Sequence, residues 1–497
     1  MRFELYSEAP LELSCDLVAL CAFEGKLQDV RLFQELDRAL SGQLSAVAAE
    51  EAFSGKDEQR LCVHTHGQLK AKRVLLVGLG PREGFDVTDT RRYGARVADE
   101  SRRRGAKRVG VALPPLDPSA NERAAQFLVE GTLLGEYRFE RYRAEAERTK
   151  SSLEQLDVLA PNGCDALSLA RGQVIADGVR LARDLVNEPP AALTPRKLAD
   201  AARELARDKD LECKVLTPKE CEKLGMGLFL AVAQGSAEEG RFIHLTYRPK
   251  GREQPKRRIV LVGKGVTFDS GGLSLKPTAS MLDMKTDMAG AAAVLGAISV
   301  LPALGLQSEV HVLVAAAENM VSGRAYRLGD VYRGMSGISV EIANTDAEGR
   351  LTLADALSYG LTLKPDEIID IATLTGACAV ALGPHIAGVM GNDNAAIERY
   401  LGAARRVGEE LWQLPLPARL AEQLKSEVAD LKNIGERFGG ALTAGLFLKR
   451  FVNSTSWIHV DIAGPASAEK GKDHVPRGGT GFGVLSLVEY LAARDRS

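Results

Sequence analysis

Apolar and polar positions alternate along the chain in blocks that predict strands separated by helices. In the first part, apolar runs at 73–80, 108–114 and 153–161 predict strands, and a charged stretch at 88–104 has helical spacing. A further helix-like span, 165–186, leads into a proline-rich segment that breaks the pattern. The pattern therefore places a domain junction in or beside that helix.

The second part of the chain is larger and repeats one theme. Its apolar runs predict buried strands at 258–263, 310–317, 338–343, 366–374 and 456–464. Helix-like stretches lie between most of them, which is typical of a largely parallel sheet covered on both faces. We therefore predict an α/β protein with a smaller N-terminal α/β domain and a larger C-terminal α/β domain that has a mostly parallel central sheet. The predicted parts are a domain at 1–164, a linking helix at 165–186 and a domain at 187–497.

Composition and charge exclude several classes of protein. The chain has 497 residues, too many for one core, and its 64 basic and 66 acidic residues give a net charge of −2. This balance provides no global attraction to nucleic acid or to anionic membranes. Acidic residues interrupt the N-terminal segment, which does not resemble a targeting peptide, and we expect no membrane span because no window approaches 18 uncharged apolar residues. Seven scattered cysteines without a CxxC pair are typical of reduced thiols in the cytoplasm.

The segment NTDAEGR, residues 344–350, follows a predicted strand and gathers Asp346, Glu348 and Arg350. One interpretation is a capping box, in which Thr345 and Glu348 satisfy amides at the start of the next helix. Capping leaves Asp346 and Arg350 unexplained. The alternative is a functional site, because residues two apart point to the same side of an extended backbone. Ligands of parallel sheets also bind beyond the carboxyl ends of the strands.

A second cluster of charges follows the strand predicted at 258–263. Residues 263–294 contain Asp269 beside a glycine pair and Asp287 at the start of a helix of small residues. Their order does not match G-x-x-x-x-G-K-[ST], which argues against a phosphate-binding loop. A solvated loop would explain the mixed charges, and Asp287 suits the first turn of a helix. Neither interpretation explains the glycine pair beside Asp269.

Metal chemistry connects the two clusters. Packed together without cations, the four carboxylates would raise one another's pKa: Asp269, Asp287, Asp346 and Glu348. Two divalent ions about 3.5–4 Å apart would neutralise them, a common arrangement for hydrolysis. Oxygen ligands favour hard ions such as Mn²⁺ or Mg²⁺, and Zn²⁺ can occupy such a site. The His/Cys group at 62–66 is interpreted as a plain strand face rather than a zinc site.

These residues lie in motifs that resemble the leucyl aminopeptidases, a family of cytosolic peptidases with two metal ions. The matching motifs are VGKGVTFDSGGLSLKP (262–277), MKTDMAGAAAV (284–294), ENMVSGRAYRLGDV (318–331), NTDAEGRL (344–351), DIATLTGA (370–377), WIHVDIAGPA (457–466) and GGTGFGV (478–484). In the first part, YRFERYR (137–143) and the NEPP turn (187–190) resemble the family, which implies a macro-like N-terminal domain. The resemblance implies a metal-dependent aminopeptidase that releases leucine and other hydrophobic residues from the N-termini of short peptides.

The resemblance also implies a set of metal ligands. One metal would be surrounded by Lys264, Asp269, Asp287 and Glu348, and the other by Asp269, Asp346 and Glu348. Asp269 and Glu348 would thus bridge both ions. An ammonium group has no lone pair, so Lys264 would bind as the neutral amine, with a pKa lowered by two dications.

Lys276 and Arg350 match the catalytic pair of the family. The resemblance implies that Lys276 stays cationic and stabilises the oxyanion formed when a hydroxide that bridges the metals attacks the scissile carbonyl. It implies that Arg350 holds a bicarbonate ion as the general base, which suits the planar fork of a guanidinium. On this interpretation Gly349 lets the backbone turn between the ligands and Arg350, and the capping box is incidental.

Resemblance to the family further implies a substrate pocket and an assembly. The pocket would be lined by Met284, Thr373, Leu374, Gly376 and Ala463. Such small and apolar residues suit a hydrophobic side chain. The assembly implied is a cytoplasmic homohexamer whose enclosed active sites would admit short peptides.

Two other functions stay open at this point. One is a regulator that binds DNA through the folded scaffold, although the balanced charge argues against nucleic acid as the main partner. The other is a two-metal phosphoesterase, because the carboxylates, Lys276 and Arg350 would also suit phosphate. Peptide is preferred to phosphate on the resemblance alone.

Overall fold

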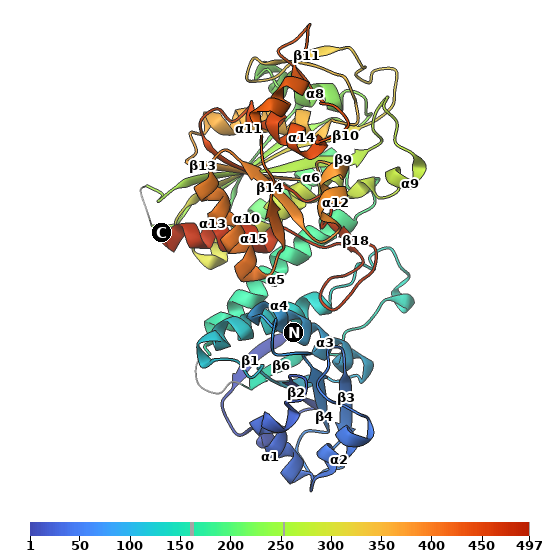
Figure 1. The fold of residues 1–497 in the computed structure, drawn as a ribbon, viewed down its shortest axis with the longest axis vertical. Helices are drawn as coiled ribbons and strands as arrows, with labels where there is room; N and C mark the ends of the chain where they lie inside the picture. The colour runs from blue at the N-terminus through green and yellow to red at the C-terminus, as the bar shows by residue number, and fades with distance from the viewer. Residues whose placement is uncertain (160–163, 252–253, 497) are drawn as a thin grey trace. The chain divides into compact units, whose positions relative to one another are not determined.

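The computed structural model describes residues 1–159, 164–251 and 254–496 (Figure 1). The chain divides into two compact units. The first unit consists of Met1–Ala176 and Gly471–Pro476, and the second of Asp177–Lys470 and Arg477–Ser497.

The helix expected between the domains is α5, Ala166–Asn187, and the division between the two units falls within it. The boundaries proposed from the sequence at 164 and 187 stay a prediction. Asn187 and the prolines that follow it end this helix, as the proline-rich pattern indicated.

The first unit contains one sheet of six strands in the order β1-β6-β5-β2-β4-β3. Neighbouring strands are parallel except for β3 and β4. The strands are β1 (Arg2–Tyr6), β2 (Leu17–Ala22), β3 (Arg60–His64), β4 (Arg73–Gly78), β5 (Arg108–Ala112) and β6 (Gln155–Leu159). The helices that follow them are α1 (Arg31–Ala39), α2 (Gln43–Glu50), α3 (Thr90–Arg103) and α4 (Asn121–Gly135). Residues 160 and 161 of the strand expected at 153–161 lie outside the described residues.

Both faces of this sheet are buried, as alternation along β2 shows. Leu17, Ala19 and Cys21 belong to the cluster beneath α3 and α4, whereas Val18 and Leu20 belong to the cluster beneath α1 and α2. Successive side chains of a strand point to opposite faces, so a sheet covered twice needs a continuous apolar run. Of the group at 62–66, which was interpreted as a plain strand face, residues 62–64 lie in the edge strand β3 and residues 65 and 66 follow it.

The second unit contains an eight-stranded sheet in the order β15-β14-β17-β13-β9-β10-β8-β7. The central strands β17, β13, β9 and β10 are mutually parallel, and β8, β7 and β14 run antiparallel to a neighbour. The strands are β7 (Glu212–Leu216), β8 (Arg241–Tyr247), β9 (Arg258–Asp269), β10 (Glu309–Asn319), β13 (Glu367–Ala372), β14 (Ala387–Gly391), β15 (Leu411–Gln413) and β17 (Ser456–Asp461). This sheet confirms the predicted α/β class with a mostly parallel centre.

Helices cover both faces of this sheet (Figure 1). The longer ones are α6 (Pro195–Lys209), α8 (Gly227–Ala233), α10 (Ala289–Leu304), α11 (Gly349–Thr362), α12 (Gly376–Leu382), α13 (Asn394–Val407), α14 (Gly440–Lys449) and α15 (Val484–Arg496). The short helices α7 (Pro218–Lys223) and α9 (Thr278–Met281) complete the set, and a two-stranded sheet pairs β18 (Ser467–Ala468) with β19 (Gly478–Gly479).

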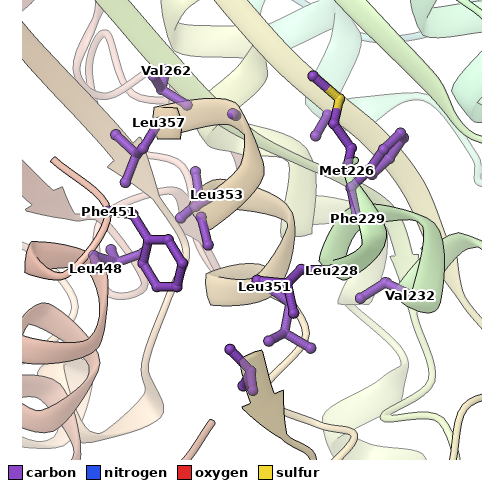
Figure 2. Close-up of a cluster of buried hydrophobic side chains, with 14 of the residues drawn as sticks. Met226, Leu228, Phe229, Val232, Val262, Leu351, Leu353, Leu357, Leu448 and Phe451 are labelled. Atoms are coloured by element: carbon purple, nitrogen blue, oxygen red, sulfur yellow. The ribbon is translucent and has the colours of Figure 1, made fainter. Parts of the chain in front are cut away.

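Helix α11 is anchored in the hydrophobic core of the second unit. Figure 2 shows Leu353 and Leu357 of α11 on the side of Phe451, and Leu351 beside Leu228 of α8. All five side chains are almost completely buried, and full burial of one Leu or Phe contributes about 1.5–3 kcal/mol. The core therefore fixes the direction of α11 and, with it, the turn that precedes its first residue.

One predicted strand lies in a different sheet from the one expected. The run at 338–343 forms β12 (Ser339–Glu341), which pairs with β11 (Val331–Arg333) and β16 (Leu431–Lys432) in a separate three-stranded sheet. The interpretation of 344–350 as a loop at the edge of the central sheet was therefore wrong. An apolar run predicts that a strand is buried, but its pairing partner depends on distant segments.

The expectation that no window is long and apolar enough to span a membrane was also wrong. The helical segment Met284–Leu304 meets that criterion, but 83% of its most apolar window is buried inside the protein. Small residues allow this helical segment to pack closely inside the protein. A methyl group added to Gly290 would lie 2.1 Å from Ile371 O, so the backbone of α10 lies directly against the sheet. This is the packing of a core helix.

Candidate metal centre

The carboxyl end of β9 carries the first two side chains of the candidate site. Lys264 and Asp269 both lie on this central strand, and both are buried. The chain then turns through Gly271 and Gly272, whose φ angles are +83° and +61°, a region that favours glycine. A methyl group at position 271 would lie 2.9 Å from Asp346 Oδ1, so this turn also passes against the second cluster.

The remaining carboxylates come from two other segments. Asp287 lies in the 3-10 turn η6, Met284–Met288, immediately before α10, and Asp346 and Glu348 lie in the turn before α11. Carboxylate oxygens of Asp269, Asp346 and Glu348 all lie within 4.8 Å of one another. Asp287 and Glu348 are buried, whereas Asp346 is exposed. The structure therefore brings together the two clusters that the sequence separates by more than fifty residues.

Lys264 lies between two of these carboxylates. Its Nζ is 2.7 Å from Asp287 Oδ1 and 2.9 Å from Glu348 Oε1, and it donates to Thr373 O at 2.9 Å. Burial would lower the pKa of Lys264, but the charges of Asp287 and Glu348 outweigh burial and raise it. In this arrangement the side chain is an ammonium. Cations that neutralise the carboxylates would be needed to make its lone pair available.

Lys276 forms an equivalent bridge on the more open side. Its Nζ is 2.9 Å from Asp269 Oδ2 and 2.6 Å from Asp346 Oδ1. Burial would lower the pKa of Lys276, but the charge of Asp269 and the hydrogen bond to Asp346 raise it above its usual value. Each of the two lysines thus places a positive charge between two carboxylate groups of the cluster.

Three of the carboxyl groups have raised pKa values. Burial is the largest cause for Asp269, Asp287 and Asp346, and the charge of Glu348 raises the pKa of Asp269 further. This is the effect expected of crowded carboxylates in a protected site. Burial outweighs the nearby lysines, which lower the pKa of these groups.

The donor set fits divalent cations. Within the described residues, Asp287 Oδ2 and Glu348 Oε2 are buried oxygens without a hydrogen-bond partner. Buried polar atoms are nearly always satisfied, so two such oxygens in one cluster indicate a ligand of positive charge. Carboxylate oxygens suit Mn²⁺, Mg²⁺ and Zn²⁺.

The reason for Gly349 differs from the one expected. A methyl group there would lie 2.3 Å from Lys264 Cε and 2.7 Å from Lys264 Nζ, so glycine is required by the close approach of that side chain rather than by a turn. The capping box is not formed between the residues described at this turn. Thr345 Oγ1 instead donates to Gly271 O at 2.7 Å and accepts from Ser274 N at 2.8 Å.

Arg350 lies on the first turn of α11 and is buried. Its Nη1 donates to Asn433 O at 2.9 Å, and its Nε is a buried atom without a hydrogen-bond partner in the described part of the chain. Burial lowers the pKa of Arg350 to about 10, although Glu348 and Asp461 oppose this shift. Arg350 is therefore helical, and the extended geometry that would have aligned it with residues 346 and 348 was wrong.

The residues expected to line a substrate pocket occupy three segments beside these carboxylates. Met284 lies in the same η6 turn as Asp287, and Thr373 Oγ1 donates to Asp287 Oδ1 at 2.7 Å. Leu374 and Ala463 follow the ends of β13 and β17, which are parallel neighbours in the sheet. Gly376, the remaining member of the set, is exposed at the start of α12, and the other four are partly exposed.

Two buried residues organise the site without having been predicted from the sequence. Asp461 Oδ1 accepts from Leu374 N and Ala463 N, both at 3.1 Å, and so joins the two loops. Asn319 Nδ2 donates to Asp269 Oδ1 at 2.8 Å and orients that carboxylate. Both residues lie at the ends of strands, within motifs named above. That position is the feature of the sequence from which their role could have been predicted.

Comparison with known proteins identifies the family. The family model described as the cytosol aminopeptidase family, catalytic domain, matches residues 180–488. The model described as the cytosol aminopeptidase family, N-terminal domain, matches residues 19–146. Together the two models cover most of the chain and both of its compact units.

Relatives and solved structures agree with the family models. A probable cytosol aminopeptidase of Persephonella marina is 45% identical over 468 residues, 93% of each chain, and one of Gloeobacter violaceus is 42% identical over 99% of this chain and 100% of its own. A mutant of tomato leucine aminopeptidase has a TM-score of 0.90 at 36% identity, covering 99% of this chain and 96% of its own. The bottromycin maturation enzyme BotP in complex with Mn has a TM-score of 0.86 at 37% identity, covering 97% and 99%. The chain therefore belongs to the cytosol aminopeptidase family, whose members are metal-dependent aminopeptidases, and it is a hydrolase.

Proposed function

We propose that the protein removes N-terminal residues, with leucine and other hydrophobic residues preferred, from short peptides. The observation that carries this proposal is the convergence of Asp269, Asp346 and Glu348 within 4.8 Å, next to buried carboxylate oxygens that have no partner among the described residues. Balanced positive and negative charge over the whole chain gives no support to nucleic acid as the main partner.

Two divalent ions would be held by this cluster. The proposed ligands are Lys264, Asp269, Asp287, Asp346 and Glu348, with Asp269 and Glu348 shared between the ions. When bound, such ions supply Lewis acidity and lower the pKa of water. Mn²⁺ is supported by the Mn complex of the similar enzyme BotP, and Zn²⁺ or Mg²⁺ also suits the oxygen donors.

Lys276 is proposed to stabilise the negative charge that develops on the scissile carbonyl oxygen. Its Nζ already lies within 3 Å of two of the proposed ligands, so a substrate held at those ligands would lie within its reach. A preorganised cation in a protected site is effective because it requires little reorganisation during reaction. Ions bound by Asp269 and Asp346 would compete with Lys276 for those oxygens and release its Nζ toward substrate.

Arg350 is proposed to orient the general base. Its guanidinium is buried and keeps Nε without a partner among the described residues, so a planar anion such as bicarbonate could accept from it. The helix packing of α11 and the hydrogen bond to Asn433 O keep the guanidinium in one place. In this proposal Arg350 holds the anion in position, and the anion accepts the proton.

The N-terminal side chain of the substrate is proposed to lie against Met284, Thr373, Leu374, Gly376 and Ala463. Partial exposure of these residues beside the carboxylates supports this assignment. We further propose a cytoplasmic homohexamer, supported by the family to which the chain belongs. In a closed assembly the restricted access to the site would favour short peptides.

The decisive experiment measures hydrolysis of leucine p-nitroanilide and of its N-acetylated form by protein stripped with chelator and resupplied with Mn²⁺, Zn²⁺ or Mg²⁺. We expect activity only on the substrate with a free amine, and only after a metal is restored. Full activity after chelation, or preference for the blocked substrate, would contradict the proposal. A parallel assay with p-nitrophenyl phosphate tests the phosphoesterase alternative.

A further inference from the structure

One buried residue outside the charged cluster, Asn433, is bonded both to the turn that carries Asp346 and to Arg350. Asn433 follows β16, which pairs in parallel with β12, and its backbone N donates to Glu341 O at 3.0 Å. This pairing brings residue 433 alongside the turn that leads to Asp346 and Glu348. Asn433 is completely buried.

The side chain of Asn433 satisfies the backbone of that turn. Its Oδ1 accepts from Ala343 N at 2.9 Å and from Asn344 N at 3.3 Å. Its Nδ2 donates to Asn344 O at 2.6 Å and to Ala347 O at 3.4 Å. One amide group therefore fixes both ends of the segment 343–347, within which Asp346 lies.

The backbone of the same residue holds the proposed catalytic arginine. Arg350 Nη1 donates to Asn433 O at 2.9 Å. The side chain and the carbonyl of Asn433 extend from the same Cα and are both held by hydrogen bonds, so a shift of this Cα would move both. The position of Arg350 is thereby tied to the position of the turn that carries Asp346 and Glu348.

We infer that Asn433 is a positioning residue that sets the distance between the carboxylates of the metal centre and Arg350. This inference rests on the proposed function, since it assigns Asn433 a role in that site. Groups that orient metal ligands from outside the coordination sphere typically contribute 10–100-fold to metal affinity or activity. A residue with a merely structural role would contribute to stability and leave metal affinity unchanged.

The chain provides a control in Asn392, which is exposed but makes a similar set of hydrogen bonds. Its Nδ2 donates to Thr455 O and its Oδ1 accepts from Trp457 N, both at 2.8 Å, and its backbone N donates to Trp457 O at 3.2 Å. It thus forms the same type of clamp between two other segments, β14 and the start of β17. Loss of this clamp should affect stability without affecting the metal centre.

The test compares wild-type protein with Asn433→Ala, Asn433→Asp and Asn392→Ala. Calorimetry measures the Mn²⁺ affinity of the chelator-treated proteins. The values of kcat and KM on leucine p-nitroanilide are determined after Mn²⁺ is restored. The midpoint of thermal unfolding is measured separately. Asn433→Asp keeps the acceptor for both amides, loses both donated hydrogen bonds and preserves side-chain shape, which makes it the measurable variant if Asn433→Ala does not fold.

We expect the Asn433 variants to lose about 10–100-fold in Mn²⁺ affinity and in kcat. Asn392→Ala should lower the unfolding midpoint and leave Mn²⁺ affinity and kcat within about twofold of wild type. Folded Asn433 variants with wild-type Mn²⁺ affinity and kcat would overturn the inference alone. Wild-type protein that neither binds Mn²⁺ nor hydrolyses the substrate would overturn the proposed function, and the inference with it.

Discussion

Gly349 lies so close to Lys264 that a methyl group at position 349 would be 2.3 Å from Lys264 Cε. The first helical residue of α11 and a buried side chain of β9 therefore occupy adjoining space. Any larger residue at 349 must displace either Lys264 or the turn that carries Glu348.

Gly349→Ala should reduce kcat/KM by roughly 100-fold, the size of effect expected from a displacement of about 1 Å at a reacting site. Alanine is the better helix former, so local stability of α11 should not decrease. The matched control is Gly402→Ala in α13, where the nearest atom to an added methyl group is Arg406 Nη1 at 3.6 Å. Steady-state kinetics on leucine p-nitroanilide check this, and equal activity of the two variants would contradict the steric argument.

Asp269→Asn and Glu348→Gln should each lower the Mn²⁺ content below two ions per chain. Each change removes a charged oxygen that we propose is shared by both ions, so both affinity and rate should fall. Metal analysis after gel filtration measures the content. If either variant retained two ions per chain, the shared-ligand assignment would be wrong.

Lys276→Ala should keep the metals and lose turnover. Its Nζ is bonded to Asp269 and Asp346, so its removal leaves the carboxylates more negative and should not weaken Mn²⁺ binding. The expected loss in kcat is about 10²–10³-fold, the size associated with one preorganised donor to an oxyanion. Comparison of kcat and Mn²⁺ affinity in one preparation separates this role from that of a ligand, and near-normal kcat would make Lys276 merely structural.

Asp461→Asn should affect substrate binding more than chemistry. Asp461 accepts from Leu374 N, Ala463 N and Thr375 Oγ1, so a weaker acceptor should loosen both pocket loops. We expect KM for leucine p-nitroanilide to rise several-fold while Mn²⁺ content stays unchanged.

The control for Asp461→Asn is Asp393→Asn. Asp393 accepts from Ala395 N, Ala396 N and Ser456 Oγ at the start of α13 and thus has the same types of donor. The expected KM for Asp393→Asn is that of wild type. An equal rise in KM for the two variants would show a general loss of order rather than a pocket effect.

The protein should lose stability as the pH falls below about 6.5, in part through His244. This side chain is bonded to His311 Nδ1 at 3.0 Å and Tyr359 OH at 3.2 Å, with Thr246 Oγ1 also in contact. Burial and His311 lower the pKa of His244 to about 4, so the unfolded chain binds a proton more readily than the folded one. The contribution of neutral His244 is complete above its unfolded pKa and is lost as the pH falls toward 4.

Urea unfolding at pH 7 and pH 5 measures this effect. We expect a loss on the order of 1–2 kcal/mol attributable to His244 between these two pH values. His244→Gln cannot be protonated, so its free energy of unfolding should depend less steeply on pH. An unchanged slope in that variant would assign the acid sensitivity to other groups. The first candidates are His311, which is bonded to His244, and Glu309, which is bonded to His311.

The hydrophobic pattern predicted the fold class, because burial on both faces of a sheet imposes continuous apolar strands that are visible in any window of the chain. It also located the strand β9 and the helix α11, on which three of the proposed site residues lie: Lys264, Asp269 and Arg350. It could not assign β12 to its sheet, since pairing depends on β11 and β16, the latter about ninety residues distant.

The chain's own sequence determined which side chains are available for chemistry: four carboxylates, two lysines and an arginine in recognisable motifs. Only the tertiary structure decided how they meet. Three contacts join residues more than eighty positions apart. Gly349 lies against Lys264, Asp461 accepts a hydrogen bond from Leu374 N, and Asn433 accepts one from Arg350. Such contacts arise from the packing of distant segments against one core, and no local periodicity encodes them.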